Sequence, residues 1–222
     1  MFSRNERVIG KDNQQILKLK KITIVGLGGV GGYVAEMLTR LGIGELTIVD
    51  FDKIDISNIN RQIIATTKNV GLYKTDEFEK RLGEINPEII IHKKTQKITK
   101  ENIAQVIEDN SDFVIDAIDD ITAKVAIAKY CQYNKINHVS SMGTGNRYKG
   151  VPNFSVDKIQ NTSYDKLAKK FREELKKENI KDINVVYSKQ PAEKTDALGS
   201  IVYYPLMCAG TIVSYVINCI IK

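Results

Sequence analysis

The stretch KITIVGLGGVG, residues 21–31, decides the fold of this chain. Its apolar run, residues 22–25, predicts a buried strand, and the glycines that follow match the pattern G-x-G-x-x-G. Apolar residues at helical spacing come next, and a second apolar run, residues 46–49, predicts a second strand. Strand, glycine turn, helix and strand in this order form the unit that holds a nucleotide phosphate at a helix N-terminus.

An acidic residue stands where a ribose-binding carboxylate is expected. Asp50 directly follows the second predicted strand, about 20 residues after the last glycine of the pattern. At that distance an acid bonds the ribose hydroxyls of a bound nucleotide. The alternative is that the glycines serve only the close packing of a helix on a strand. The residues predicted to form the nucleotide site are Gly26, Gly28, Gly29, Gly31 and Asp50.

Length and composition are those of a globular domain. The 222 residues, 42% of them hydrophobic, are enough for one domain with a sizeable core. The net charge of +6 gives a mild preference for anionic partners such as nucleotides or RNA. The cysteines are few and form no C-x-x-C pair, which indicates neither a zinc knuckle nor a disulfide framework. Because the N-terminus is also too polar for a signal peptide, we expect a cytoplasmic protein.

Strand and helix patterns alternate after the glycine unit. This alternation predicts an α/β fold, a doubly wound, mostly parallel, Rossmann-like sheet with flanking helices. Residues 1–20 predict a polar arm and a short helix. We expect a single domain, 1–222, with a nucleotide-binding core at 1–145 and a substrate-side extension at 146–222. Further helices are expected at residues 73–85, 100–109 and 121–134, and further strands at residues 89–91, 113–117 and 138–141.

The extension combines a basic helix with an apolar closing helix. Strands are expected at residues 151–156 and 184–188, with a strongly basic helix at 164–178 between them. The lysines of this basic helix suit RNA phosphates, although the glutamates between them also suit a plain solvated surface. Residues 201–221 are long enough for a membrane span, but Pro205 and several polar residues interrupt them. We therefore expect a buried closing helix that starts near Pro205 and does not enter a membrane.

Polar residues also cluster after several predicted strands. Asn58 and Arg61 lie in a long loop, residues 51–72, and Lys74 opens the next helix. The Arg61 guanidinium is a fork of donors that suits phosphate oxygens. The run DAIDD, residues 116–120, places several carboxylates at a strand end, as Mg²⁺ on a triphosphate requires. Because parallel strands end at one edge of the sheet, this set favours ATP with magnesium over NAD.

The order of these motifs resembles a known enzyme family. GxGGxG is followed by VDFD at residues 49–52, SNxxRQ at 57–62, VGxxK at 70–74, NP at 86–87 and DxxD at 116–119. This order resembles the ATP-dependent adenylating family, which includes the ubiquitin-activating enzyme and the adenylyltransferases of bacterial sulfur-carrier proteins. The resemblance covers residues 2 to about 145.

The resemblance implies roles for individual residues. It implies ATP beside Gly28, its ribose on Asp50, and Mg²⁺ on Asp119. Asp120 stands where the family has asparagine, so its role stays open. The other residues that the resemblance places in the nucleotide site are Asn58, Arg61 and Lys74 at the phosphates, with Asp52 and Asp120 close by.

The resemblance also implies a homodimer. The start of the chain, Phe2-Ser3-Arg4, is similar to the family's N-terminal arginine arm, which reaches the ATP of the neighbouring subunit. Arg4 fits the arm best, and Arg7 is the alternative. The implied catalytic residues are then Arg61, Lys74 and Asp119 of one chain and Arg4 of its partner.

One branch of the family is more similar than the others. RNERVIG at residues 4–10, SSMGTGN at 140–146, LAKK at 167–170 and VVYS at 185–188 resemble the tRNA threonylcarbamoyladenosine dehydratases. This implies an enzyme that adenylates the carboxylate of threonylcarbamoyladenosine in tRNA and drives its cyclisation, without a thioester-forming cysteine or zinc. His92 and His138 occupy strand positions and are expected to be structural, so no general base is identified.

Three other functions stay open at this point. The first is an adenylyltransferase for a sulfur-carrier protein, which would make such a carrier the partner in place of tRNA. An NAD-binding redox regulator is the second, because the first βαβ unit would serve it equally well. The third is a non-catalytic RNA-binding module that uses the basic helix.

Overall fold

The computed structural model describes residues 1–221 and contains one mixed sheet. Its strands lie in the order β3-β2-β1-β4-β5-β7-β6. All neighbouring pairs are parallel except β6 and β7, which are antiparallel. The strands are β1 (Lys21–Val25), β2 (Glu45–Val49), β3 (Ile90–Lys94), β4 (Phe113–Asp116), β5 (Asn137–Ser141), β6 (Phe154–Lys158) and β7 (Asn184–Ser188).

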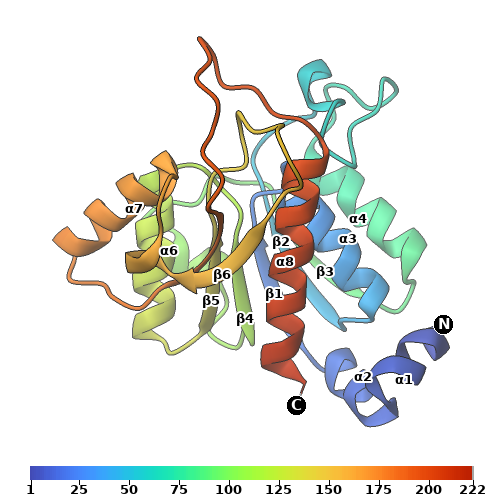
Figure 1. The fold of residues 1–222 in the computed structure, drawn as a ribbon. Helices are drawn as coiled ribbons and strands as arrows, with labels where there is room; N and C mark the ends of the chain where they lie inside the picture. Colours follow the sequence, from blue (N-terminus) through green and yellow to red (C-terminus); the bar gives the residue numbers. More distant parts are fainter. Residues whose placement is uncertain (222) are drawn as a thin grey trace.

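Helices cover both faces of the sheet (Figure 1). α3, α4 and α8 pack on one face, and α5, α6 and α7 on the other. The doubly wound, Rossmann-like fold predicted from the sequence is therefore confirmed. The helices are α1 (Ser3–Ile9), α2 (Lys11–Lys18), α3 (Gly31–Leu41), α4 (Lys74–Ile85), α5 (Ile103–Val106), α6 (Ile121–Tyr133), α7 (Lys166–Lys177) and α8 (Tyr203–Ile220), with two 3-10 turns, η1 (Ile56–Asn58) and η2 (Ile159–Asn161).

The central strands are buried on both faces. Each of β1, β2 and β4 is a nearly continuous apolar run, as a parallel sheet between two helix layers requires. Ile24, Ile48 and Ile115 are fully buried in the layer that also holds α3 and α8. The strands of the 146–222 extension continue this sheet, because β7 pairs with β5.

Three local predictions differ from the structure. The polar arm is helical from Ser3, and the helix expected at 100–109 is reduced to α5, which has four residues. The Asn102 side chain accepts from the backbone N–H of Thr99 and donates to the Lys97 carbonyl, so a turn occupies the start of that segment. β6 begins at Phe154 rather than at residue 151, since Pro152 has no N–H for a ladder bond.

The last helix closes the fold as predicted. Among the described residues, α8 is the one helix long and apolar enough to cross a membrane. One of its faces packs on α3 and β6 instead, and Figure 1 shows it lying across the sheet. The buried residues of α8 are Tyr204, Pro205, Cys208, Ala209, Ile212, Val213, Val216 and Ile217.

His138 is structural, as predicted, and is buried without a polar partner. Within residues 1–221 neither ring nitrogen has a hydrogen-bond partner. Burial is the main cause that lowers the pKa of His138 to about 4; Asp116 opposes the shift, and the nearby Lys124 ammonium adds to it. The imidazole is therefore neutral at pH 7 in the folded chain.

This burial predicts a loss of stability in acid. The unfolded chain protonates His138 near pH 6.5 and the folded chain only near pH 4, so the unfolded state binds more protons between these values. We expect the free energy of unfolding to fall by roughly 3 kcal/mol over this range on account of this residue. Urea unfolding at pH 7.5 and 4.5 should show a smaller loss for His138→Leu than for the wild type. Equal losses would contradict the prediction.

Candidate active site

Two glycines of the turn after β1 are required by packing. Gly26 has φ +91°, and a Cβ there would lie 2.8 Å from the carbonyl oxygen of Ala117. A Cβ on Gly31 would lie only 1.8 Å from the carbonyl oxygen of Gly26. The turn can therefore form only with glycine at these two positions. It also brings the loop after β4 into direct contact with the turn.

Gly28 is not explained by packing. A Cβ on Gly28 would meet nothing closer than Gln62 Nε2, at 3.9 Å. Because no protein atom fills the space where a Cβ of Gly28 would lie, a phosphate could approach the backbone closely there. α3 begins directly after this turn, and its N-cap residue, Val30, provides no side-chain cap. The Gly32 N–H donates to the Gly28 carbonyl at 3.0 Å, whereas no hydrogen bond within residues 1–221 uses the Gly31 N–H, so the turn keeps a donor for an anion and fits a nucleotide better than it fits packing alone.

Asp50 is held against the same turn. Its Oδ2 accepts the Leu27 N–H at 2.7 Å, and its Oδ1 accepts the Asp52 N–H at 2.8 Å. Burial raises the pKa of Asp50, while Lys74 and the two amides oppose the rise. Each oxygen keeps a free lone pair, so the carboxylate can still accept a ribose hydroxyl.

Lys74 lies between two acids. Its Nζ is 2.8 Å from Asp52 Oδ2 and 3.8 Å from Asp50 Oδ2, and the lysine side chain is buried. The structure therefore brings Lys74, Asp50 and Asp52 together, as the resemblance implies. The ammonium offsets the charge of both carboxylates at this position. Contact between Lys74 and a phosphate stays a prediction.

The loop 51–72 carries Arg61 to the glycine turn. Arg61 Cγ lies 3.6 Å from the position of a Cβ on Gly29, and its guanidinium donates to the Ser57 carbonyl at 2.8 Å. Asn58 organises this loop, because its side chain accepts the Asp55 N–H and its carbonyl accepts the Arg61 N–H. Asn58 is thus placed to hold Arg61 beside the turn. The contact of either residue with a phosphate is untested.

The two acids after β4 have different environments. Asp120 caps α6 by accepting the Ala123 N–H at 3.1 Å, and its Oδ2 lies 3.2 Å from Lys97 Nζ. These contacts, the Ala123 amide first, lower the pKa of Asp120. Asp119 is exposed, and no other residue in 1–221 forms a hydrogen bond or ion pair with its carboxylate. Asp119 is therefore the acid free to bind a cation, and Asp120 serves the helix.

A magnesium ion would need oxygens from the nucleotide here. The described residues contain no group of three His, Cys, Asp or Glu side chains that could hold a metal ion. Mg²⁺ commonly keeps several waters and uses one or two carboxylates together with phosphate oxygens. Asp119 with a triphosphate fits that requirement.

Lys124 is a site residue that the sequence patterns missed. Its buried Nζ donates to Asp116 Oδ2 at 3.0 Å, to Ser140 Oγ at 2.7 Å and to the Ser141 carbonyl at 3.0 Å. It joins the carboxyl ends of β4 and β5 to the first turn of α6. The one available signal was a single lysine among the apolar residues of the predicted helix at 121–134.

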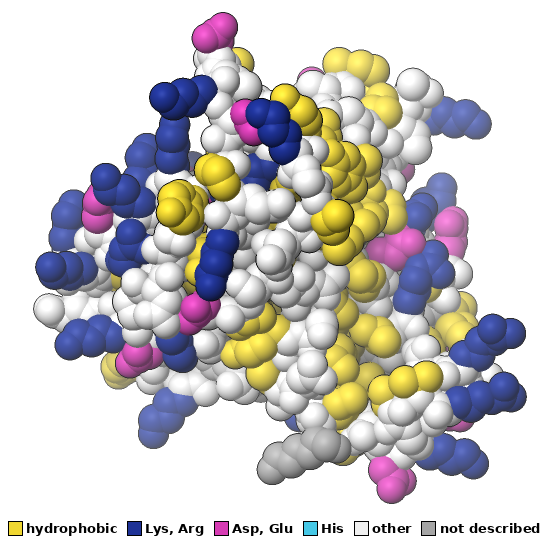
Figure 2. All heavy atoms as spheres, viewed as in Figure 1, with side chains coloured by type: hydrophobic (Ala, Val, Ile, Leu, Met, Phe, Trp, Pro, Cys, Tyr) yellow, Lys and Arg dark blue, Asp and Glu magenta, His cyan; other side chains and the backbone are white. Residues whose placement is uncertain are grey.

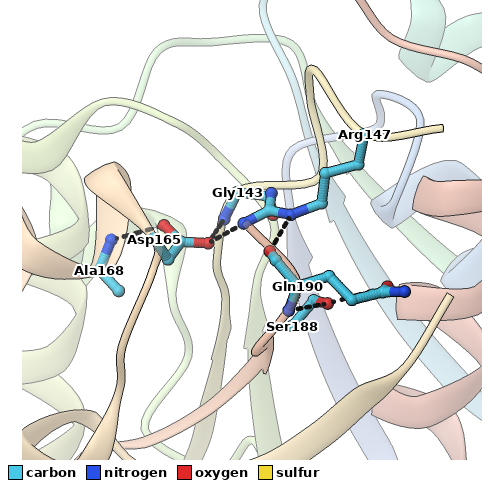
Figure 3. A network of polar contacts seen from close by, with 6 residues as sticks. All are labelled: Gly143, Arg147, Asp165, Ala168, Ser188 and Gln190. Carbon is cyan, nitrogen blue, oxygen red and sulfur yellow. Dashed lines mark hydrogen bonds and ion pairs between the residues drawn. The ribbon is translucent and has the colours of Figure 1, made fainter. Parts of the chain in front are cut away.

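A second network holds the loop after β5 (Figure 3). The Arg147 guanidinium donates to the carbonyls of Gly143 and Gln190 and reaches Asp165 Oδ2 at 3.4 Å. Asp165 caps α7 through the Ala168 N–H and also accepts the Gly143 N–H. This network fixes the extension against the carboxyl edge of the sheet.

The extension also touches the nucleotide turn directly. Pro205, at the start of α8, lies 3.3 Å from the position of a Cβ on Gly29. Asn60, next to Arg61, donates to the Ser200 carbonyl at 2.8 Å. The carboxyl edge is therefore covered from one side by the segment that leads from β7 into α8.

Arg4 is the one predicted catalytic residue that lies elsewhere. It is exposed on α1, and its neighbour Asn5 donates to the Arg40 carbonyl near the end of α3. The glycine turn is at the other end of α3, roughly 15 Å away along the helix axis. The arm thus sits at the amino edge of the sheet, remote from the nucleotide turn of its own chain.

One edge of this doubly wound sheet carries the turn at Gly28, the acid Asp50 after β2 and the acid Asp119 after β4. This arrangement defines a Rossmann-like nucleotide-binding protein. A family model described as the ThiF family matches residues 2–222. The chain belongs to the ThiF family.

Similar proteins cover most of this chain. A tRNA threonylcarbamoyladenosine dehydratase of Bacillus subtilis (strain 168) is 39% identical over 188 residues, which are 84% of this chain and 74% of the relative. The crystal structure of the E. coli tRNA N6-threonylcarbamoyladenosine dehydratase TcdA in complex with ATP superposes with a TM-score of 0.93 at 32% identity. That match covers 99% of this chain and 93% of the other. A molybdopterin-synthase adenylyltransferase of Haemophilus influenzae is 30% identical over 164 residues, 74% of this chain and 66% of the relative.

The different environments of the two acids after β4 predict different effects of mutation. Asp119→Ala should abolish ATP turnover without loss of stability, because the carboxylate holds nothing within the described residues. Asp120→Ser should retain turnover, since serine also caps a helix, whereas Asp120→Ala should cost about 1 kcal/mol of stability. Pyrophosphate release and urea unfolding measure the two effects. Wild-type turnover by Asp119→Ala would contradict the assignment.

Proposed function

We propose that this chain is an ATP-dependent enzyme that adenylates the carboxylate of threonylcarbamoyladenosine in tRNA and drives its cyclisation with loss of water. The observation that carries the proposal is the match of 99% of this chain to the ATP complex of the E. coli dehydratase. The open Gly28 and the free Asp119 support it, because they leave room for a triphosphate and a cation at the same edge.

The arrangement suits carboxylate activation. A carboxylate is a poor electrophile at neutral pH, and adenylation gives it a good leaving group. Attack on the α-phosphate increases negative charge, which the N-terminus of α3 and the Arg61 guanidinium are placed to stabilise. Asp119 would hold Mg²⁺, which neutralises phosphate charge. A nitrogen of the same side chain then attacks the activated carbonyl, loses its proton and displaces AMP, and this ring closure benefits from proximity.

The assay that tests this function combines the purified protein with ATP, Mg²⁺ and threonylcarbamoyladenosine-containing tRNA. Mass spectrometry of the nucleosides should show the loss of one water from the modified adenosine. Omission of ATP is the control. An intact nucleoside, together with pyrophosphate exchange stimulated by a sulfur-carrier protein, would instead favour the adenylyltransferase. That alternative has the shorter and less identical match.

We also propose a homodimer in the cytoplasm, in which Arg4 completes the site of the partner chain. The position of α1 supports this, because it lies near the end of α3 that is opposite the glycine turn of its own chain. Tyr203, Leu206 and Met207 leave apolar surface exposed on α8, and Figure 2 shows apolar side chains along that side. An apolar surface of this kind suits a subunit interface.

The dimer predicts complementation between inactive variants. Arg4→Ala and Arg61→Ala should each be inactive alone, whereas a mixed dimer should contain one intact site. That site combines Arg61 of one chain with Arg4 of the other. Activity should therefore return when the two variants are unfolded and refolded together, but not when each is refolded alone. A monomer in light scattering, or no recovered activity, would contradict the proposal.

The basic helix α7 is proposed to contact tRNA phosphates. Arg172 is bound to the carbonyls of Ile159 and Thr162 and is not free for RNA. Lys169 and Lys170 are exposed and have no ion-pair partner within residues 1–221. Figure 2 shows lysine and arginine side chains crowding the side of the molecule where α7 lies.

Charge reversal on α7 tests this contact. Lys169→Glu with Lys170→Glu should weaken tRNA binding and flatten its salt dependence by about one unit of log–log slope for each lost phosphate contact. Pyrophosphate exchange on a minimal nucleoside substrate should not change. Filter binding at several salt concentrations measures the slope, and an unaltered slope would return α7 to a structural role.

A further inference from the structure

Two exposed tyrosines flank the buried ion pair of the extension. Tyr148 and Tyr164 are 57% and 72% exposed. Tyr148 follows Arg147 in the chain, and Tyr164 precedes Asp165, while the charged side chains between them are buried and lie 3.4 Å apart. Each of the two charged residues of the network in Figure 3 thus has an exposed tyrosine next to it in the chain.

The backbone at Tyr148 is held unusually firmly for a loop. The Tyr148 carbonyl accepts the Tyr203 hydroxyl at 2.8 Å, and the Lys149 carbonyl accepts the Tyr204 hydroxyl at 2.8 Å. On the other side, the Asn146 N–H donates to the Gly199 carbonyl at 2.8 Å. Loops anchored in this way lose little entropy when they bind a ligand, so Tyr148 is preorganised on the outside of the fold.

Tyr164 has a backbone conformation that costs energy. Its φ is +56°, which is uncommon for a residue with a bulky side chain. The following residue, Asp165, must cap α7 and bond Gly143 and Arg147 at once, and these contacts hold the turn in place. The ring of Tyr164 is left in solvent and takes no part in the core. Backbone strain beside an exposed aromatic ring is typical of binding surfaces.

The position of these rings relative to the nucleotide turn is set by α8. Tyr203, which holds Tyr148, stands two residues before Pro205, which packs on Gly29. One helix end thus connects the tyrosine loop to the phosphate side of the nucleotide site. A group bound at Tyr148 is therefore held at the same edge as the ATP phosphates.

The charge around the rings suits a nucleic acid. Lys149 Nζ lies 5.5 Å from the centroid of the Tyr148 ring, and Glu193 offsets part of its charge at 3.0 Å. The lysines of α7 add positive charge next to Tyr164. Aromatic rings in a basic setting bind single strands, because every base can stack and the phosphates are drawn to the cations.

We infer that Tyr148, together with Tyr164, is a stacking platform for unpaired bases of the tRNA anticodon loop. The inference rests on the proposed function, since the resemblance to the tRNA threonylcarbamoyladenosine dehydratases implies a modified adenosine beside the anticodon. Stacking of its neighbours on rings tied to α8 would present the carboxylate to the α-phosphate.

The test measures binding of an anticodon stem-loop RNA to the full chain. Tyr148→Ala should bind about 5- to 150-fold more weakly, and Tyr148→Phe, which keeps the ring, should bind nearly as the wild type does. Tyr133→Ala is the matched control, because Tyr133 is 85% exposed but is the last residue of α6, the helix end that leads back to the start of β5 and not to the carboxyl edge of the sheet. The KM for ATP should be unchanged in all three variants.

An abasic scan separates stacking from a purely structural effect. Stem-loops that each lack one loop base are titrated against the wild type and Tyr148→Ala. At the stacked position the two losses should not add, since either change removes the same contact. Losses that add at every loop position, or wild-type affinity in Tyr148→Ala, would overturn the inference.

Failure of the proposed function has a different signature. If the wild type binds the stem-loop through Tyr148 but does not dehydrate the modified nucleoside, the stacking platform is supported and the enzymatic function is contradicted. If dehydration occurs and Tyr148→Ala leaves the KM for tRNA unchanged, the function stands and the platform falls. A wild type that binds no stem-loop, but responds to a carrier-protein tail, overturns the platform as well.

Discussion

The ion pair between Lys124 and Asp116 is the constraint on which the carboxyl edge of the sheet depends. Both side chains are fully buried, so the pair is stable only if its remaining donors and acceptors are satisfied. Ser140 meets this need by accepting from Lys124 and donating to Asp116, and the Ser141 carbonyl takes the last ammonium proton. Removal of one partner would leave a buried charge, at a cost of about 3–5 kcal/mol. The ends of β4 and β5 are therefore held together, and the loops that follow them start from fixed points.

Much of this edge could be predicted from local patterns. The glycine turn, Asp50 and Arg61 were found because each depends on residues close in sequence, and the parallel topology then brings strand ends together. In the structure Asp50 accepts the Leu27 N–H of the glycine turn and lies 3.8 Å from Lys74 Nζ, and the binding of a nucleotide by these residues stays a prediction. The sequence alone could not show that Gly26 and Gly31 are required by packing whereas Gly28 is not. A Cβ on Gly26 or Gly31 would collide with the carbonyl of Ala117 or Gly26, and only the folded structure shows these contacts.

Several of the unpredicted features depend on partners far apart in the chain. Asp116 and Ser140 are separated by 24 positions, and Tyr148 and Tyr203 by 55. No periodicity encodes such pairs. The role of Asp120 likewise stayed open in sequence, because it stands where the family has asparagine. The register of the helix decides, because only Asp120 stands three residues before the N–H of Ala123.

The contacts between the core and the extension bear on how the reaction geometry is achieved. The extension is tied to the glycine turn and its neighbouring loop by Pro205 on Gly29, by Asn60 on Ser200 and by the two tyrosine hydroxyls on the loop after β5. These contacts are made by the chain itself, so alignment of a carboxylate with a phosphate does not require the two halves to assemble on binding. The effective concentration of the carboxylate at the α-phosphate then depends on positions that are fixed when the chain folds. The ordering of these elements is therefore stabilised by folding, including the buried Lys124 ion pair. Less of the binding free energy of a large RNA substrate is then needed to order the site for adenylation.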